Sequence, residues 1–197
     1  MANITAAAVN ELRKRTGVGM MDCKKALVEC DGDMDKAIDY LREKGQKLAA
    51  KRADRDASEG AVLATVNADK TFAAVIMMNC ETDFVAKNED FVAFTREVLQ
   101  TAVDAKAKSL EEVMALTING LSVETMIVEQ VAKIGEKITL SHYYPIEAVA
   151  TYAYVHPGNR MASVVGLSKA GYDEEGKEMS MQVIAGRPVA LNKESVP

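Results

Sequence analysis

Two short segments carry side chains whose exposure or burial decides what this chain could do. The first is Gly17–Lys25, in which two glycines precede the adjacent residues Met20 and Met21. Neighbouring residues on a helix point about 100° apart, so a small bundle cannot bury both methionines equally. An exposed methionine makes an adaptable contact surface for a partner. The alternative is that both methionines close a miniature helical core.

The second segment is Cys80–Ala86, which follows a predicted buried strand. In one interpretation Thr82 or Asp83 caps a helix, and Phe84 packs into the core as a hydrophobic staple. In the other, Phe84 is an apolar wedge beside a carboxylate on a projecting turn. Such a pair could enter a groove between helices of a partner and disturb a polar or metal site there. The residues alone leave both interpretations open.

Motifs that would indicate an enzyme are missing from the sequence. Gly17-Val18-Gly19 is the only GxG, and it lacks both the third glycine and the preceding strand of a dinucleotide-binding turn. There is no phosphate-binding GxxxxGK[ST] loop and no GxSxG nucleophile elbow. His142 and His156 have no second ligand at metal spacing. We therefore expect a protein that is not an enzyme and that holds no metal or cofactor of its own.

Composition narrows the classes of partner. Among 197 residues, aromatic residues make up 5%, tryptophan is absent, and the formal net charge is −5. Nucleic-acid binding usually relies on a basic field or on aromatic stacking, so we expect no direct nucleic-acid contact. No apolar run of 18 residues and no signal peptide is present, so we expect no membrane contact. The three cysteines are odd in number and unclustered, which favours reduced thiols and a cytoplasmic location.

The first segment is positioned by a predicted three-helix bundle. Thr5 is expected to cap the first helix, and the second runs from about Met20 to Cys30. Asp33 is expected to cap a third helix that ends at Gly45. Residues 42–55 then form a basic connector that is expected to continue as helix. This connector is either a solvated linker or a docking strip for an acidic partner surface.

The second segment belongs to a predicted α+β core. Its first unit is a hairpin, followed by a helix over residues 89–105. A weak internal repeat aligns residues 66–75 with 155–164, which predicts a second hairpin followed by a helix over 173–185 with Met179, Val183 and Ile184 inward. The remaining elements are the hairpin strands 60–66 and 71–78, helices near 110–116 and 122–133, and strands near 137–144, 148–155 and 161–167.

The fold class that follows is α+β, with a three-helix bundle and two related antiparallel hairpin-plus-helix subdomains. We place the bundle and connector at residues 1–55, the first core subdomain at 56–140 and the second at 141–197. Residues 187–197 are turn-like and add no closing element, so we expect the second subdomain to be truncated.

Three stretches of the sequence resemble the signatures of the elongation factor Ts family. They read RTGVGMMDCKKAL at Arg15–Leu27, NCETDFVAKN at Asn79–Asn88 and VAKIGEKI at Val131–Ile138. They occur in the family's order and spacing, and the resemblance spans essentially the whole chain. It implies that the bundle is ubiquitin-associated-like, and that the core consists of two subdomains.

The resemblance also implies a function: guanine-nucleotide exchange on elongation factor Tu, the GTPase that delivers aminoacyl-tRNA to the ribosome. The Thr82-Asp83-Phe84-Val85 turn would then intrude near the partner's magnesium site. The resemblance implies that partner-binding residues are found on the bundle and on the connector; they are Met20, Met21, Lys24, Lys51 and Arg52. The alternative is a protein-binding scaffold with a ubiquitin-associated-like domain and no exchange activity.

Overall fold

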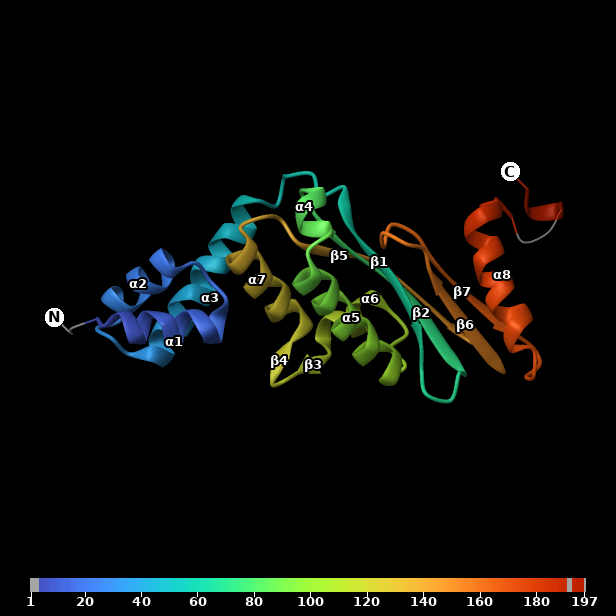
Figure 1. The fold of residues 1–197 in the computed structure, drawn as a ribbon, viewed down its shortest axis with the longest axis horizontal. Coiled ribbons are helices and arrows are strands. Elements are labelled where there is room, and N and C mark those ends of the chain that lie inside the picture. The colour runs from blue at the N-terminus through green and yellow to red at the C-terminus, as the bar shows by residue number, and fades with distance from the viewer. Residues whose placement is uncertain (1–3, 191–192, 197) are drawn as a thin grey trace.

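Three helices form a bundle at one end of the elongated molecule (Figure 1). The computed structural model describes residues 4–190 and 193–196. Thr5 and Asp33 cap their helices through side-chain oxygens, as expected. A separate apolar cluster fills the bundle, centred on the fully buried Leu12, Cys23 and Leu27. The helices are α1 (Ala6–Thr16), α2 (Met20–Glu29) and α3 (Met34–Lys51).

Helix α3 continues past Gly45, so the predicted helix end at that glycine is wrong. Gly45 is buried where α3 crosses α7, and an added Cβ would lie 2.9 Å from the Cβ of Ala132. The glycine therefore permits a close approach of two helices. The expectation that the connector continues as helix is confirmed as far as Lys51, and α3 joins the bundle to the core.

The first core unit is a three-stranded antiparallel sheet in the order β1-β2-β5, covered on one face by α5. The predicted hairpin and the predicted helix that follows it are confirmed, and α5 buries Phe91, Phe94, Val98 and Leu99. The expected subdomain boundary near residue 140 falls inside β5, which pairs with β2. The elements are β1 (Glu59–Val66), β2 (Phe72–Cys80), α4 (Asp83–Ala86), α5 (Glu89–Asp104), α6 (Leu110–Ala115), β3 (Thr117–Ile118), β4 (Leu121–Ser122), α7 (Val123–Ile134) and β5 (Thr139–Glu147).

The second unit is the hairpin of β6 (Ala150–Val155) and β7 (Ala162–Leu167), followed by α8 (Asp173–Gly186). It lies at the opposite end of the molecule from the bundle (Figure 1). The predicted turn is confirmed: the His156 N–H donates to the Met161 carbonyl, and Gly158 has a φ of 91°.

The predicted inward face of α8 is wrong. Met179 and Val183 are 48% and 37% exposed, and Ile184 is only partly buried. The residues that α8 buries are the small ones, Gly176 and Ser180. The ring of Tyr152 fills the space beside Gly176, where an added Cβ would lie 2.2 Å from a ring carbon. Large side chains on that face of α8 are thereby excluded.

The α+β fold class with a helical bundle and two hairpin-plus-helix units is confirmed. Part of the turn-like segment 187–197 lies outside the described residues, and its described part includes a 3-10 turn at Lys193–Ser195. Across the described ranges, every helix is too short or too polar to cross a membrane.

Candidate protein-interaction site

The Thr82–Val85 turn projects from the end of β2 as the short helix α4 (Figure 1). Thr82 is the N-cap residue, and its hydroxyl accepts a hydrogen bond from the Val85 N–H. Val85 and Ala86 pack against the core. The turn therefore has an inner side that is held by the core and an outer side that is free to meet a partner.

Phe84 lies on the outer side and is 83% exposed. The interpretation of Phe84 as a core staple is therefore wrong. Leaving a phenylalanine ring exposed forgoes about 1.5–3 kcal/mol of burial free energy, which contact with another molecule would recover. Thr82 capping, the other half of that interpretation, is confirmed.

Asp83 precedes Phe84 and is partly buried. The Lys87 ammonium donates a hydrogen bond to Asp83 Oδ2 at 2.6 Å, one helical turn further on. This bond lowers the pKa of the Asp83 carboxyl below its usual range, so the group is ionised at neutral pH. The outer side of the turn thus presents a carboxylate next to an aromatic ring.

The turn is anchored from the loop between α7 and β5. Glu136 accepts backbone hydrogen bonds from Glu81 and Thr82, both at 3.0 Å, through one carboxylate oxygen. Its other oxygen accepts the Thr82 hydroxyl at 2.7 Å. Three donors from two consecutive residues therefore converge on a single carboxylate.

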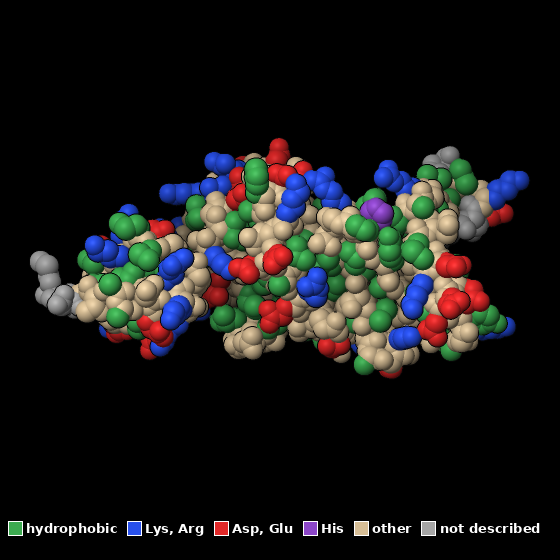
Figure 2. Space-filling model, in the orientation of Figure 1, with side chains coloured by type: hydrophobic (Ala, Val, Ile, Leu, Met, Phe, Trp, Pro, Cys, Tyr) green, Lys and Arg blue, Asp and Glu red, His purple; other side chains and the backbone are tan. Residues whose placement is uncertain are grey.

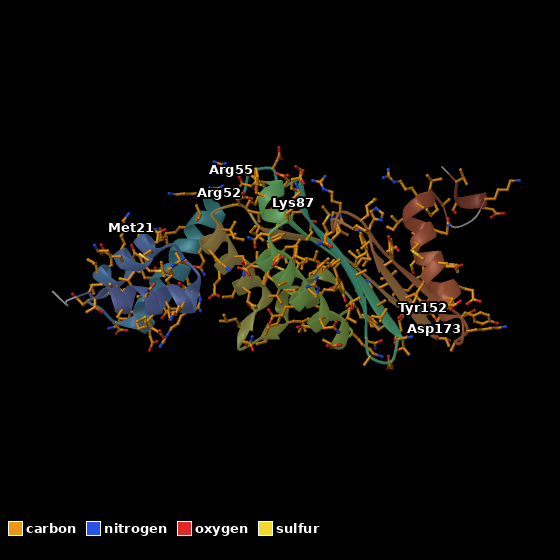
Figure 3. The ribbon with its side chains drawn as sticks, in the orientation of Figure 1. Met21, Arg52, Arg55, Lys87, Tyr152 and Asp173 are labelled. Carbon is orange, nitrogen blue, oxygen red and sulfur yellow. The ribbon has the colours of Figure 1, made fainter. Side chains whose placement is uncertain are left out.

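Glu81 makes the reciprocal contact. Its carboxylate accepts the Lys137 N–H at 2.6 Å and the Arg52 guanidinium at 2.5 Å, and Arg55 lies 3.3 Å away. The Lys137 N–H, and after it Arg52, lower the pKa of the Glu81 carboxyl. Figure 3 shows Arg52 and Arg55 beside Lys87 along the upper edge of the molecule.

Arg52 is accordingly held within the chain. Its side chain is 23% exposed and forms an ion pair with Glu81. The structure places it next to the turn and ties the end of the connector to the residue that precedes Thr82. Lys51 is exposed at the last position of α3.

The bundle supplies a second exposed surface. Met20 is 50% and Met21 65% exposed, so the interpretation in which both methionines close the bundle core is wrong. Lys24 is exposed one turn further along α2. Met21 lies on the same upper side of the view as Arg52 and Lys87 (Figure 3), and lysines and arginines gather along that side in Figure 2.

A groove connects the bundle surface with the turn. Gly17, which ends α1 with a φ of 69°, lines it together with Phe84 and Val85. Phe91 and Ile134 add apolar walls from α5 and α7. The structure thus brings the end of α1 and the Phe84 turn to one hollowed region.

Sequence reasoning missed Glu81 and Glu136, the residues that hold the turn. Their partners lie 54 to 56 positions apart in the chain, a separation that helical or strand periodicity does not report. The available signal was that both glutamates fall within the signature-like stretches Asn79–Asn88 and Val131–Ile138.

The described residues contain no group of three His, Cys, Asp or Glu side chains that could hold a metal ion. Cys23 and Cys80 are buried and Cys30 is partly buried, and burial raises the pKa of the Cys80 thiol to about 11. The features that remain are a projecting aromatic residue, an ionised carboxylate and a methionine surface, which are suited to binding a protein.

Two family models match the chain. One, described as "Elongation factor TS", covers residues 81–197, and the other, "Elongation factor Ts, mitochondrial, N-terminal", covers residues 1–49. This chain belongs to the elongation factor Ts family. The first model begins at Glu81, directly before the anchored turn, and the second contains α1, α2 and most of α3.

Curated members of the elongation factor Ts family match over nearly all of the chain. The elongation factor Ts of Christiangramia forsetii is 53% identical over 100% of this chain and 72% of its own length. Those of Flavobacterium psychrophilum and Amoebophilus asiaticus are 48% and 47% identical, over 100% and 98% of this chain and 72% and 71% of theirs. Family membership identifies the chain as a translation elongation factor that acts in protein biosynthesis.

Proposed function

We propose that this chain binds elongation factor Tu loaded with GDP and accelerates the release of GDP. The GTPase can then bind GTP. The chain itself makes and breaks no covalent bond, and it acts in the cytoplasm, where translation takes place. The single observation that carries the proposal is the 83% exposed Phe84 beside Asp83 on an anchored turn.

The physical basis is differential binding. A GTPase holds GDP through backbone amides around the phosphates and through Mg²⁺, which bridges a phosphate oxygen to protein ligands. An exchange protein binds the GTPase without metal and nucleotide more tightly than it binds the GDP-loaded GTPase. It must then lower the affinity of the GTPase for GDP by the same ratio. Exchange therefore requires contacts that only the disrupted state of the partner can make.

Phe84 and Asp83 have the chemistry for those contacts. The ring supplies an apolar wedge that gains burial only if helices of the partner separate to receive it. The Asp83 carboxylate brings a negative charge that competes with the metal ligands of the partner. Thr82 and Val85 flank the pair and hold its backbone through the cap and the core contact.

A second contact with the partner, remote from its nucleotide, is proposed for Met20, Met21 and Lys24. Met20 and Met21 are exposed and adaptable, and Gly17, three residues before Met20, lines the same groove as Phe84. Lys24 and Lys51 add positive charge that can attract an acidic surface. Arg52 contributes by holding Glu81 next to the turn.

Release of a fluorescent GDP analogue from elongation factor Tu tests the proposal. The chain is mixed with the loaded GTPase under excess unlabelled GDP, and the release rate is followed as the chain concentration rises. We expect a rate that rises and saturates. Tight binding without acceleration would instead support the scaffold function and contradict exchange.

A further inference from the structure

We propose that Glu136 is the positioning residue of the Phe84 turn, and that it acts on nucleotide exchange through Thr82 without contacting the partner's nucleotide. The inference rests on the proposed exchange function. It concerns how a largely exposed ring is held in a fixed direction, which neither its own few contacts nor the short helix α4 explains.

Helix α4 cannot hold Phe84 by itself. It comprises four residues, and helices shorter than about 12 residues are marginal in water without tertiary support. The Phe84 ring makes little packing contact with the rest of the chain, since it is 83% exposed. The direction of the wedge therefore depends on what fixes the first residues of the turn.

Glu136 fixes those residues from another part of the chain. It follows Gly135, whose φ of 83° ends α7 and turns the backbone toward the turn. The carboxylate then accepts the two N–H groups of Glu81 and Thr82 and the Thr82 hydroxyl. Hydrogen bonds to an ionised acceptor are about twice as strong as neutral ones.

The anchor is reinforced by crossed contacts between the same segments. Glu81 accepts the N–H of Lys137, the residue after Glu136. The Lys137 ammonium in turn donates to the carbonyls of Ala53 and Arg55, at 2.6 Å and 2.9 Å. Glu136 thus joins the turn to the end of α7, and the neighbouring Lys137 joins both to the connector.

Loss of this anchor leaves the core intact and lets the turn sample several directions. A partner that needs the ring in one direction then meets the competent conformer only part of the time. Contacts of the bundle remain, so the complex still forms. The maximal rate of GDP release therefore falls more than the concentration of factor needed for half-saturation rises.

Glu136→Gln is the variant to test, because it keeps the size of the side chain and removes one of the two acceptor oxygens. We expect its GDP release rate at saturation to fall about tenfold, with half-saturation changed less than about threefold. Glu147→Gln, at the opposite end of β5, is the matched control and should behave as wild type. A maximal rate for Glu136→Gln equal to that of the control would overturn the proposal.

A double-mutant cycle separates positioning from a general loss of stability. Thr82→Ser keeps the hydroxyl and should preserve the maximal rate, whereas Thr82→Val removes it and should lower the rate. If Glu136 acts through Thr82, Thr82→Val has a much smaller effect in the Glu136→Gln background than in the wild type. Additive effects of the two substitutions would contradict the assignment.

Hydrogen exchange of the free protein tests the anchor independently of any partner. The Glu81 and Thr82 amides should exchange at least tenfold faster in Glu136→Gln, while amides of β1 and β2 keep their protection. Unchanged protection at Thr82 would overturn the positioning role even if exchange activity is confirmed. A wild-type chain without exchange activity would refute the proposed function, and the amide result would still decide whether Glu136 holds the turn.

Discussion

Phe84 is the residue at which stability and function separate most clearly. Its ring is 83% exposed, so Phe84→Ala should lower the free energy of unfolding by less than about 1 kcal/mol, compared with about 3–5 kcal/mol for a buried phenylalanine. The same substitution should slow GDP release at saturation about tenfold or more, as expected for an aromatic hot spot. Chemical denaturation and stopped-flow release measure the two effects.

Tyr144→Ala is the matched control for that variant, because Tyr144 is 62% exposed on β5. It should change neither the unfolding free energy nor the release rate appreciably. Severe destabilisation by Phe84→Ala, with normal release from the folded fraction, would contradict the wedge assignment.

Glu81 makes the stability of the turn depend on pH. The Lys137 N–H and Arg52 lower the pKa of its carboxyl from the usual 4.5. The folded pKa is below the unfolded one, so this stabilisation is complete above about pH 4.5 and is lost as the pH falls through the depressed value. Glu81→Gln should therefore flatten the fall in melting temperature between about pH 5 and pH 3. An identical fall in both proteins would show that Glu81 does not contribute.

For individual residues, local roles could be predicted from the sequence, whereas roles that depend on distant parts of the chain could not. The two candidate segments and the N-cap residues Thr5 and Asp33 could be predicted, because caps and local spacing are properties of neighbouring residues. Burial of Phe84 could not be decided, since it depends on what the rest of the fold places over the turn. Glu136 was not predicted, because its role depends on residues 54 positions away.

At the scale of elements, the packing of α8 departs most from expectation. Amphipathic periodicity places large apolar residues inward, but this helix packs on the β6–β7 hairpin through Gly176 and Ser180. Gly176→Ala would put a Cβ 2.2 Å from the Tyr152 ring, and Tyr152 is buried. The substitution should therefore lower stability by about 1–3 kcal/mol, despite the better helix propensity of alanine.

Gly186→Ala, in the same helix, is the control. An added Cβ at Gly186 meets no atom within 4 Å, so alanine should be neutral or stabilise by up to about 1 kcal/mol. Thermal unfolding of both variants measures the difference. Equal stabilities of the two variants would show that α8 does not need its close contact with Tyr152.

Helix α3 shows a similar limit. Gly45 was expected to end the helix, which is the usual role of a glycine after a periodic pattern. Its actual role is to let α3 lie against α7, and nothing local to the sequence distinguishes a helix-ending glycine from one at a helix crossing. The strands and helices of the core were predicted better, because each shows its own period over several residues.

For the whole molecule, the distribution of charge should control association more than nucleotide release. Lys24 is exposed on α2, and Lys51 is exposed at the end of α3. Lys24→Glu with Lys51→Glu should reduce the association rate about tenfold at low salt, with a smaller effect at high salt and a nearly unchanged maximal release rate. Stopped-flow association at several salt concentrations measures this.

The control for charge reversal is Lys169→Glu, in the exposed loop before α8. It adds negative charge at the far end of the molecule and should leave the association rate almost unchanged. Equal rates for the double variant and the wild type at low salt would show that Lys24 and Lys51 are merely solvated.

The magnesium dependence of GDP release at saturating factor shows whether the Phe84 turn acts on the metal site of the partner. The wild type and Phe84→Ala are each mixed with GDP-loaded elongation factor Tu, and their GDP release rates are compared in millimolar Mg²⁺ and after the metal is chelated. If the turn acts by disturbing the metal site, the wild type releases GDP much faster than the variant with Mg²⁺ present, and the two rates converge once the metal is removed. A ratio between the two rates that is the same at every Mg²⁺ concentration would contradict the account.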